Sequence, residues 1–128
     1  MTAIRLADTD ANPNTVADPT WLPLSVNTAA DPSYPGAHST ISAAGADVLS
    51  SFYGDAQRFS VSSPALPGVT RSFTSFNAAA EEAGLSRIYA GQHFRFDHTA
   101  GLGLGDDVAR FVLDNALRPS HDSRGGAS

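Results

Sequence analysis

The chain has 128 residues and a formal net charge of −5, from 13 acidic and 8 basic residues. Its length suits one modest domain, and 41% hydrophobic against 16% charged residues is typical of a globular protein. The absence of cysteine excludes disulfides, thiol catalysis and thiolate metal sites. Every base is arginine, which excludes a catalytic lysine, and the acidic balance without a basic stripe argues against non-specific nucleic-acid binding.

No stretch comes near the roughly 20 consecutive apolar residues that span a bilayer, so we expect no membrane span. Residues 1–10 also lack the basic and apolar regions of a signal peptide. The chain as given is therefore expected to be soluble, and its compartment stays open.

Residues 1–37 are rich in breakers of regular structure. Each proline here removes a backbone donor and disfavours helix in the residue before it. The prolines of this segment are Pro13, Pro19, Pro23, Pro32 and Pro35. We predict an irregular N-terminal leader over 1–37 that belongs to the same domain as the residues after it.

Helical periodicity begins after the leader. Apolar residues recur at helical intervals from Ser39 to about Tyr53, and Gly54 marks the expected end of this first helix. Residues 56–72 show no strand-like alternation, so we predict a loop there. Its breakers are Pro64, Pro67 and Gly68.

Two further helices are predicted. The second begins near Thr74 or Ser75 and continues to about Tyr89, and the third begins with Asp97 as its N-cap. The apolar face of the third helix contains Leu104, Val108, Phe111 and Val112.

The predicted fold class is all-α, with a helical core over residues 38–118 and a flexible tail over 119–128. Three short helices and a long leader would bury little apolar surface for a chain of 128 residues. We therefore expect a marginal fold when the chain is alone.

His38 is the first candidate for chemistry, because it directly precedes the first helix. A helix N-terminus carries unpaired amide N–H groups and a partial positive charge, which suit an oxyanion. A histidine at that corner could exchange protons with the bound group. The alternative is a helix-entry histidine with only local hydrogen bonds.

The twelve residues Ser86–Asp97 form a second candidate cluster. The guanidinium of Arg87 is shaped to bind phosphate-like oxygens. His93 and Asp97 are four residues apart, so the carboxylate could hold one imidazole nitrogen and make the other a better nucleophile or ligand. The alternative is a surface ion pair that contributes under about 1 kcal/mol.

Other residues carry weaker signals. His98 and His121 have no partners at metal-ligand spacing and are expected at the surface, while Glu81 and Glu82 are expected on a solvated helix face. No strand precedes the alternating glycines, so a nucleotide-binding loop is not predicted. These glycines are Gly101, Gly103 and Gly105.

Two segments together resemble the signatures of a known superfamily. Residues 32–40 read PSYPGAHST, and residues 86–97 read SRIYAGQHFRFD. They resemble the second and third signatures of the vanadium-dependent haloperoxidases and type 2 phosphatidic acid phosphatases. The third signature (serine-arginine, three residues, glycine, one residue, histidine, three residues, aspartate) is met at every fixed position. The resemblance extends from Thr2 to about Leu117 and is closest to the soluble bacterial haloperoxidase-like branch.

The resemblance implies the C-terminal portion of a helical bundle that holds vanadate, or phosphate at the same place, among cations and a helix N-terminus. His93 would bind the vanadium or be the nucleophile that is phosphorylated, and Arg87 would bind oxygens of the anion. His38 would be the acid–base residue, and Asp97 would orient His93. Backbone amides at the start of the first helix would donate to the oxyanion. They are those around Gly36 and Ala37.

The chain departs from the family pattern in two places. The usual second signature reads proline-serine-glycine-histidine, whereas here it reads PGAH over residues 35–38, so the serine hydroxyl is lost. The first signature, which supplies a lysine and then an arginine-proline pair, is absent. Residues 2–5 resemble the stretch that follows that pair. We therefore expect this chain to be the C-terminal part of a longer enzyme, with any secretion signal upstream.

Loss of the first signature should weaken the site. A charge-assisted hydrogen bond contributes about 1.5–3 kcal/mol, so the loss of several costs roughly a thousandfold in oxyanion affinity. Arg87 would remain the main cation, with Arg95 as a helper. Uncovered apolar helix faces would favour aggregation or a dimer.

Three functions stay open on the sequence. The favoured one is an oxidoreductase that uses hydrogen peroxide to oxidise a halide or a small organic substrate at a histidine-bound vanadate. The second is a phosphohydrolase that cleaves a phosphate ester through a phosphohistidine at His93, with His38 protonating the leaving alcohol. The third is an inactive fragment or half-domain. The leader and residues 94–97, which read FRFD, favour the first function, as does the absence of apolar stretches long enough to span a membrane.

Overall fold

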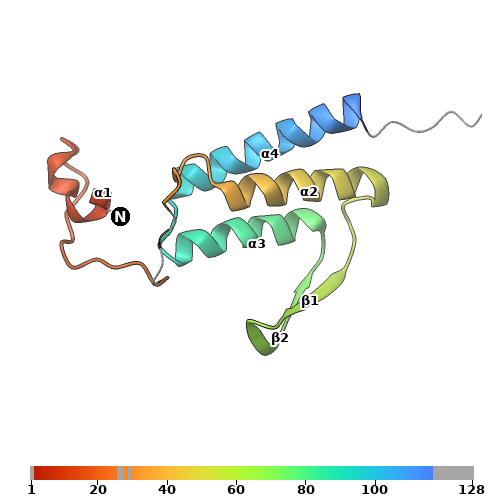
Figure 1. The fold of residues 1–128 in the computed structure, drawn as a ribbon, viewed down its shortest axis with the longest axis horizontal. Helices are drawn as coiled ribbons and strands as arrows, with labels where there is room; N and C mark the ends of the chain where they lie inside the picture. Colours follow the sequence, from red (N-terminus) through yellow and green to blue (C-terminus); the bar gives the residue numbers. More distant parts are fainter. Residues whose placement is uncertain (1, 26–27, 29, 117–128) are drawn as a thin grey trace, which may run out of the picture.

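The computed structural model describes residues 2–25, 28 and 30–116. Three helices, α2 (Ala37–Tyr53), α3 (Phe76–Tyr89) and α4 (Arg95–Asn115), lie side by side as a bundle (Figure 1). The N-terminal leader extends from one end of the bundle and contains the short helix α1 (Thr2–Arg5) and a 3₁₀ turn, η1 (Ala7–Thr9). The tail predicted over 119–128 lies outside the described residues, and the domain boundaries stay a prediction.

The first two helices confirm the predictions from periodicity except at the start of α2, which begins at Ala37 rather than Ser39. His38 therefore lies in the first turn of α2 and not before it. α2 ends before Gly54, whose φ of 77° lies in the left-handed region that glycine adopts at helix ends. α3 begins after Ser75, whose hydroxyl oxygen accepts a hydrogen bond from the Ala78 backbone N–H at 3.0 Å. Local capping chemistry therefore defines both boundaries.

The predicted start of the third helix at Asp97 is wrong. α4 begins at Arg95 with Phe94 as its N-cap, which puts Asp97 at the third helical position. Its Oδ2 accepts a hydrogen bond from the Phe94 backbone N–H at 2.9 Å. A carboxylate in the first turn meets the same unpaired amides and the same helix dipole as a capping residue, so the two positions carry similar sequence signals.

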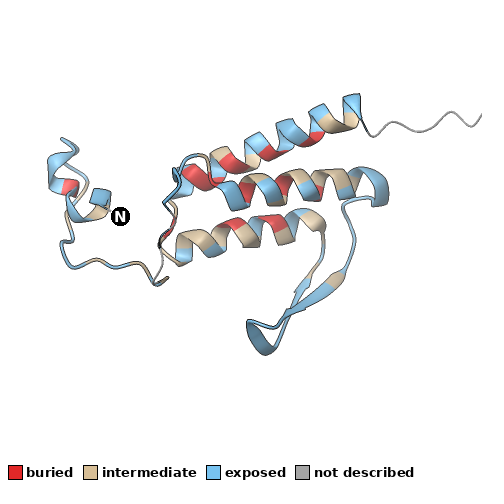
Figure 2. Cartoon of the chain, in the orientation of Figure 1, coloured by how far each residue is buried: buried red, intermediate tan, exposed pale blue. Residues whose placement is uncertain are grey.

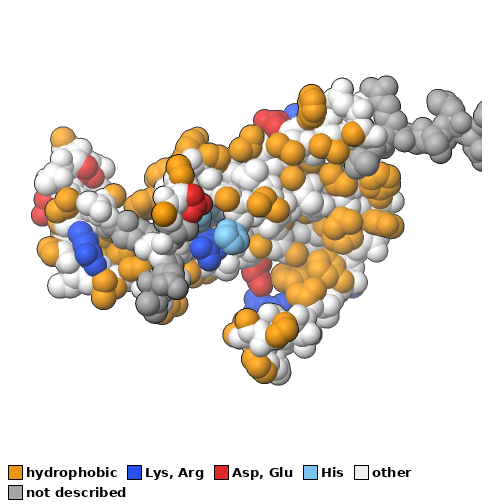
Figure 3. Space-filling view, in the orientation of Figure 1, with side chains coloured by type: hydrophobic (Ala, Val, Ile, Leu, Met, Phe, Trp, Pro, Cys, Tyr) orange, Lys and Arg blue, Asp and Glu red, His pale blue; other side chains and the backbone are white. Residues whose placement is uncertain are grey.

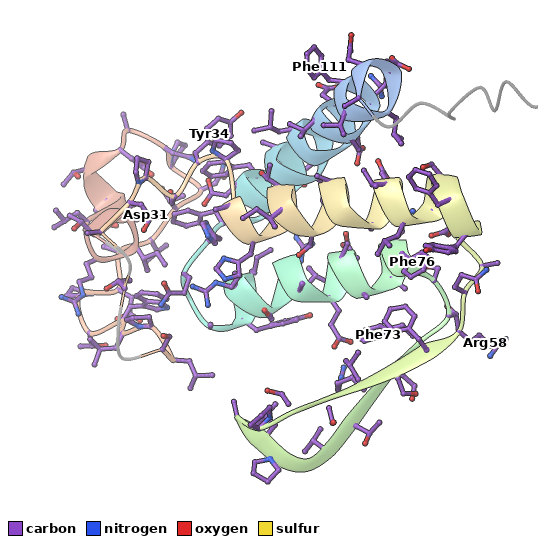
Figure 4. The ribbon with its side chains drawn as sticks, turned by 45° about the vertical axis from the view of Figure 1, so that its right-hand side comes forward. Asp31, Tyr34, Arg58, Phe73, Phe76 and Phe111 are labelled. Carbon is purple, nitrogen blue, oxygen red and sulfur yellow. The ribbon has the colours of Figure 1, made fainter. Side chains whose placement is uncertain are left out.

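The loop predicted over 56–72 is also wrong. The segment contains an antiparallel hairpin of β1 (Phe59–Ser63) and β2 (Leu66–Phe73). Nearly all of its residues are exposed, so the strands lack alternation between buried and exposed positions, and an exposed strand tolerates a proline. The ring centroid of Phe59 lies 5.4 Å from that of Phe73 and 5.5 Å from that of Phe76, which attaches the hairpin to α3. Figure 4 labels Phe73 of the hairpin and Phe76 of α3.

The core of the bundle is built from small residues. Buried positions lie on the facing sides of the three helices (Figure 2). Within the described ranges, the buried hydrophobic residues are all alanines: Ala43, Ala46, Ala80 and Ala109 in the bundle, and Ala7 in the leader. A Cβ added at Gly105 of α4 would lie only 2.5 Å from the backbone oxygen of Thr40 in α2, and one at Gly101 would lie 2.5 Å from that of Gly36. The small residues therefore allow α2 and α4 to approach closely.

Large apolar side chains lie on the outside of the bundle instead. Ile41 is 73% exposed and Phe111 is 69% exposed, and hydrophobic side chains cover much of the visible face of the helices (Figure 3). The apolar faces predicted from periodicity are thus exposed, and the dimer that such faces favour stays a prediction. No helix in the described part of the chain has the length and apolar character needed to cross a membrane.

The glycines of α4 offer a direct test of this close packing. Gly105→Ala should lower the free energy of unfolding by about 1–3 kcal/mol, because the new methyl group meets backbone atoms that cannot turn aside. The control is Gly103→Ala, where a Cβ meets nothing within 4 Å, and which should stabilise the helix by about 0.5–1 kcal/mol. Urea unfolding measures both, and equal effects of the two substitutions would contradict the packing described here.

Candidate active site

The residues of the two signatures meet around one cavity of about 700 Å³ at the end of the bundle. Ala37 and His38 line it from the first turn of α2, Arg87 from the last turn of α3, and His93 from the segment between α3 and α4. Histidine and arginine side chains adjoin on the surface between the leader and the three helices (Figure 3). The fold therefore brings together three of the side chains predicted for the site.

The leader supplies much of the remaining cavity wall, which the sequence interpretation missed. Two of its charged residues, Arg5 and Asp31, line the cavity with several apolar and small residues. The Nε of Arg5 donates a hydrogen bond to the Trp21 backbone oxygen at 2.9 Å, which limits where its guanidinium can lie. The leader lacks periodicity, so no local sequence pattern could have shown that it lies against the signature residues at the end of the bundle.

The glycine of the third signature explains how the leader reaches the bundle. Gly91 has a φ of 74°, and a Cβ there would lie 3.0 Å from the Pro23 Cα and from the Trp21 ring. Next to it, the Ser25 backbone N–H donates to the Ala90 oxygen at 3.2 Å. A larger residue at position 91 would therefore both strain the backbone and displace the leader.

Arg87 and His93 both present buried polar atoms at the site. The Nε of Arg87 is buried and has no hydrogen-bond partner within the described ranges. The His93 side chain is 13% exposed, and its Nδ1 lies 3.5 Å from Oδ2 of Asp97, whose side chain is 0% exposed. This separation is an ion-pair contact without hydrogen-bond geometry. Because both side chains are largely buried, this contact is not the surface ion pair that the sequence offers as the alternative.

Asp97 also determines the position of α2. Its backbone oxygen accepts a hydrogen bond from the Gly36 N–H at 2.8 Å. This contact corrects one prediction, since the Gly36 amide is already donated within the protein and Gly36 does not line the cavity. Ala37 does line it, and the amides of the first helical turn have no partner within the helix. Oxyanion binding by the Ala37 amide stays a prediction.

His38 is exposed at the cavity, and its pKa is lowered from the ordinary value of 6.5. Partial desolvation is the largest cause, followed by the charges of Arg87 and His93, while the Asp31 carboxylate acts in the opposite direction. The imidazole is therefore neutral at pH 7, which suits a proton acceptor.

Two predictions about neighbouring residues are wrong. Arg95, named as a helper cation, is exposed and lines a separate hollow beside Tyr34 and Phe96. His98, expected at the surface, is only 2% exposed. Sequence spacing could not reveal this, because the partners of His98 come from other helices. His121 lies outside the described residues. The two glutamates lie closer to where they were expected. Glu81 is exposed, and Glu82 pairs with Arg71 at the surface.

Residues 2–122 match a family model described as the VCPO second helical-bundle domain. The chain belongs to this family. It is thus a member of the vanadium haloperoxidase-like superfamily, and the predicted all-α bundle with a long leader is confirmed. No curated protein matches the chain.

A solved structure of a bacterial vanadium-dependent iodoperoxidase is similar to this chain, with a TM-score of 0.69 and 37% sequence identity. The similarity covers 76% of this chain and 24% of the iodoperoxidase chain. This domain therefore spans about a quarter of the length of that enzyme. Among the described residues, no group of three or more His, Asp or Glu side chains could hold a metal ion.

The lowered pKa of His38 can be measured by NMR titration of its imidazole. We expect a midpoint below 6.5, and a rise toward that value in Arg87→Gln, because the arginine charge that opposes protonation of His38 is removed. The folded state then binds this proton less tightly than the unfolded state, so His38 contributes a loss of stability as the pH falls below 6.5. Arg110→Gln, which removes an exposed arginine paired with Asp107, serves as the control and should leave the midpoint unchanged. A midpoint at or above 6.5 would refute this description of the site.

Proposed function

We propose that this domain supplies the histidine and arginine part of a vanadium-dependent haloperoxidase site. The observation that carries the proposal is that Arg87 lines one cavity together with His38 and His93, so that a guanidinium and two imidazoles converge on the same space. A guanidinium donates several hydrogen bonds in a fixed fork, the geometry that binds the oxygens of an oxyanion.

The residues around the cavity fit vanadate, which is an oxyanion rather than a bare metal ion. Arg87 would donate to its oxygens, and the free amides at the start of α2 would add donors and the positive end of a helix dipole. Nδ1 of His93 faces the Asp97 carboxylate, which favours a hydrogen on that nitrogen. Nε2 of His93 is then the nitrogen that would bind the vanadium.

His38 would act as the proton acceptor. Its lowered pKa keeps the imidazole neutral near pH 7, so it can accept the proton that hydrogen peroxide loses on activation. Bound vanadate would supply Lewis-acid activation of the peroxide for oxidation of a halide or a small organic substrate, without changing its own oxidation state. Asp31, which also lines the cavity, would limit the net positive charge around the bound anion.

Vanadate binding tests the proposal directly. Isothermal titration calorimetry of the chain in phosphate-free buffer should show saturable binding. Arg87→Ala should weaken it by about 10- to 100-fold, the equivalent of one charge-assisted hydrogen bond. His93→Ala should abolish it, because the coordinating nitrogen is lost. Affinity is expected to be low, since the described wall of the cavity offers only the arginines Arg5 and Arg87 as cations.

The matched control is Arg110→Ala, which removes an exposed arginine paired with Asp107 on α4. It should leave vanadate affinity unchanged, whereas a general charge effect would weaken binding in both arginine variants. Absence of binding by a folded chain, judged by circular dichroism, would refute the claim that these residues form a binding site by themselves.

A phosphohydrolase is the second candidate, because a phosphoryl group could occupy the same cavity. In that reaction Nε2 of His93 would attack phosphorus, and His38 would have to donate a proton to the leaving alcohol. The lowered pKa of His38 disfavours this role at neutral pH. Bromide-dependent halogenation of monochlorodimedone at pH 7, with no hydrolysis of p-nitrophenyl phosphate, is the result expected of a complete enzyme that contains this domain. The reverse result would favour the phosphohydrolase.

A further inference from the structure

A second histidine lies in the interior of the bundle, behind the candidate site. His98 of α4 is 2% exposed and contacts one polar side chain from each of the other two helices. Its Nδ1 lies 2.8 Å from the hydroxyl oxygen of Ser39 in α2, which is itself buried. Its Nε2 lies 3.2 Å from a carboxylate oxygen of Glu81 in α3, without hydrogen-bond geometry.

The core is shaped to hold this imidazole. A Cβ added at Gly84 of α3 would overlap the His98 ring and would lie 2.6 Å from the Ser39 hydroxyl oxygen. A Cβ added at Gly101 of α4 would lie 2.8 Å from the Cβ of Ser39. Two glycines from different helices therefore leave the space that this pair occupies.

Both members of the pair are next to residues of the candidate site. Ser39 follows His38, which lines the cavity, and His98 follows Asp97, which faces His93. The Gly36–Asp97 backbone hydrogen bond joins the same two helices at the same end. The start of α2 is thus joined to the start of α4 on the cavity side and again inside the core.

We propose that Ser39 and His98 are positioning residues, whose buried hydrogen bond sets the placement of His38 and of the first turn of α2 relative to His93. This inference rests on the proposed function of the cavity. Apolar contacts between alanine and glycine surfaces tolerate small shifts, whereas a hydrogen bond is directional in both distance and angle. The Glu81 carboxylate favours a hydrogen on Nε2 of His98, so that Nδ1 accepts from the Ser39 hydroxyl. Glu81 is 48% exposed, so its own contribution is small.

The test separates positioning from stability. Ser39→Ala should weaken vanadate binding three- to tenfold, measured by calorimetry at a temperature where all variants are folded. The matched control is Ala46→Gly, a buried position of α2 away from the pair, which should lower the melting temperature by a similar few degrees and leave vanadate affinity unchanged. Loss of affinity in both variants, or in neither, would overturn the inference.

A conservative variant and a second readout keep the test decisive. His98→Asn retains an amide near the position of Nδ1 and should keep most of the affinity, whereas His98→Leu should lose it as Ser39→Ala does. If the unaltered chain binds no vanadate, the proposed function fails, but imidazole NMR spectra still test positioning. The resonances of His38 and His93 should move in Ser39→Ala and in His98→Leu, and stay fixed in Ala46→Gly. Unmoved resonances in folded variants would refute the positioning role.

Discussion

The geometry of the candidate site depends on the buried side chain and backbone of Asp97. Its side chain is 0% exposed, and burial of a carboxylate is costly unless hydrogen bonds or an opposite charge compensate it. Compensation comes from the Phe94 backbone N–H and the nearby imidazole of His93, while the Asp97 backbone oxygen binds the Gly36 N–H. One residue thus contacts the start of α4, the start of α2 and the imidazole of His93.

The close approach of Gly36 to the Asp97 backbone oxygen explains one departure of this chain from its family's second signature. A Cβ at position 36 would lie 3.1 Å from the Asp97 backbone oxygen and 3.4 Å from the Ser39 hydroxyl oxygen. Glycine therefore suits the position at which the family carries a serine, because α2 and α4 are so close here. That closeness comes from the glycines of α4 that face α2, which allow backbone contact without intervening side chains.

The sequence was sufficient where the determining interactions are local. Periodicity and capping residues predicted α2 and α3, and the two residues of the third signature, Arg87 and His93, line one cavity. It was insufficient where partners are distant or exposed. The hairpin buries too little to produce an alternating pattern, and the leader contributes Arg5 to the cavity at the end of the bundle. His98 reads as a surface residue because its contacts come from α2 and α3.

A site with few cations depends more on placement than on charge. The described cavity wall holds two arginines and also an aspartate, so its net positive potential is small, and affinity must come from donors held in the right directions. Asp97 and His98 are consecutive in α4, and successive helical side chains point about 100° apart. One therefore faces His93 while the next contacts α2 and α3 inside the core. Contacts of these two neighbouring residues with the packed helices therefore restrict the positions of His38 and His93 more than a surface location would.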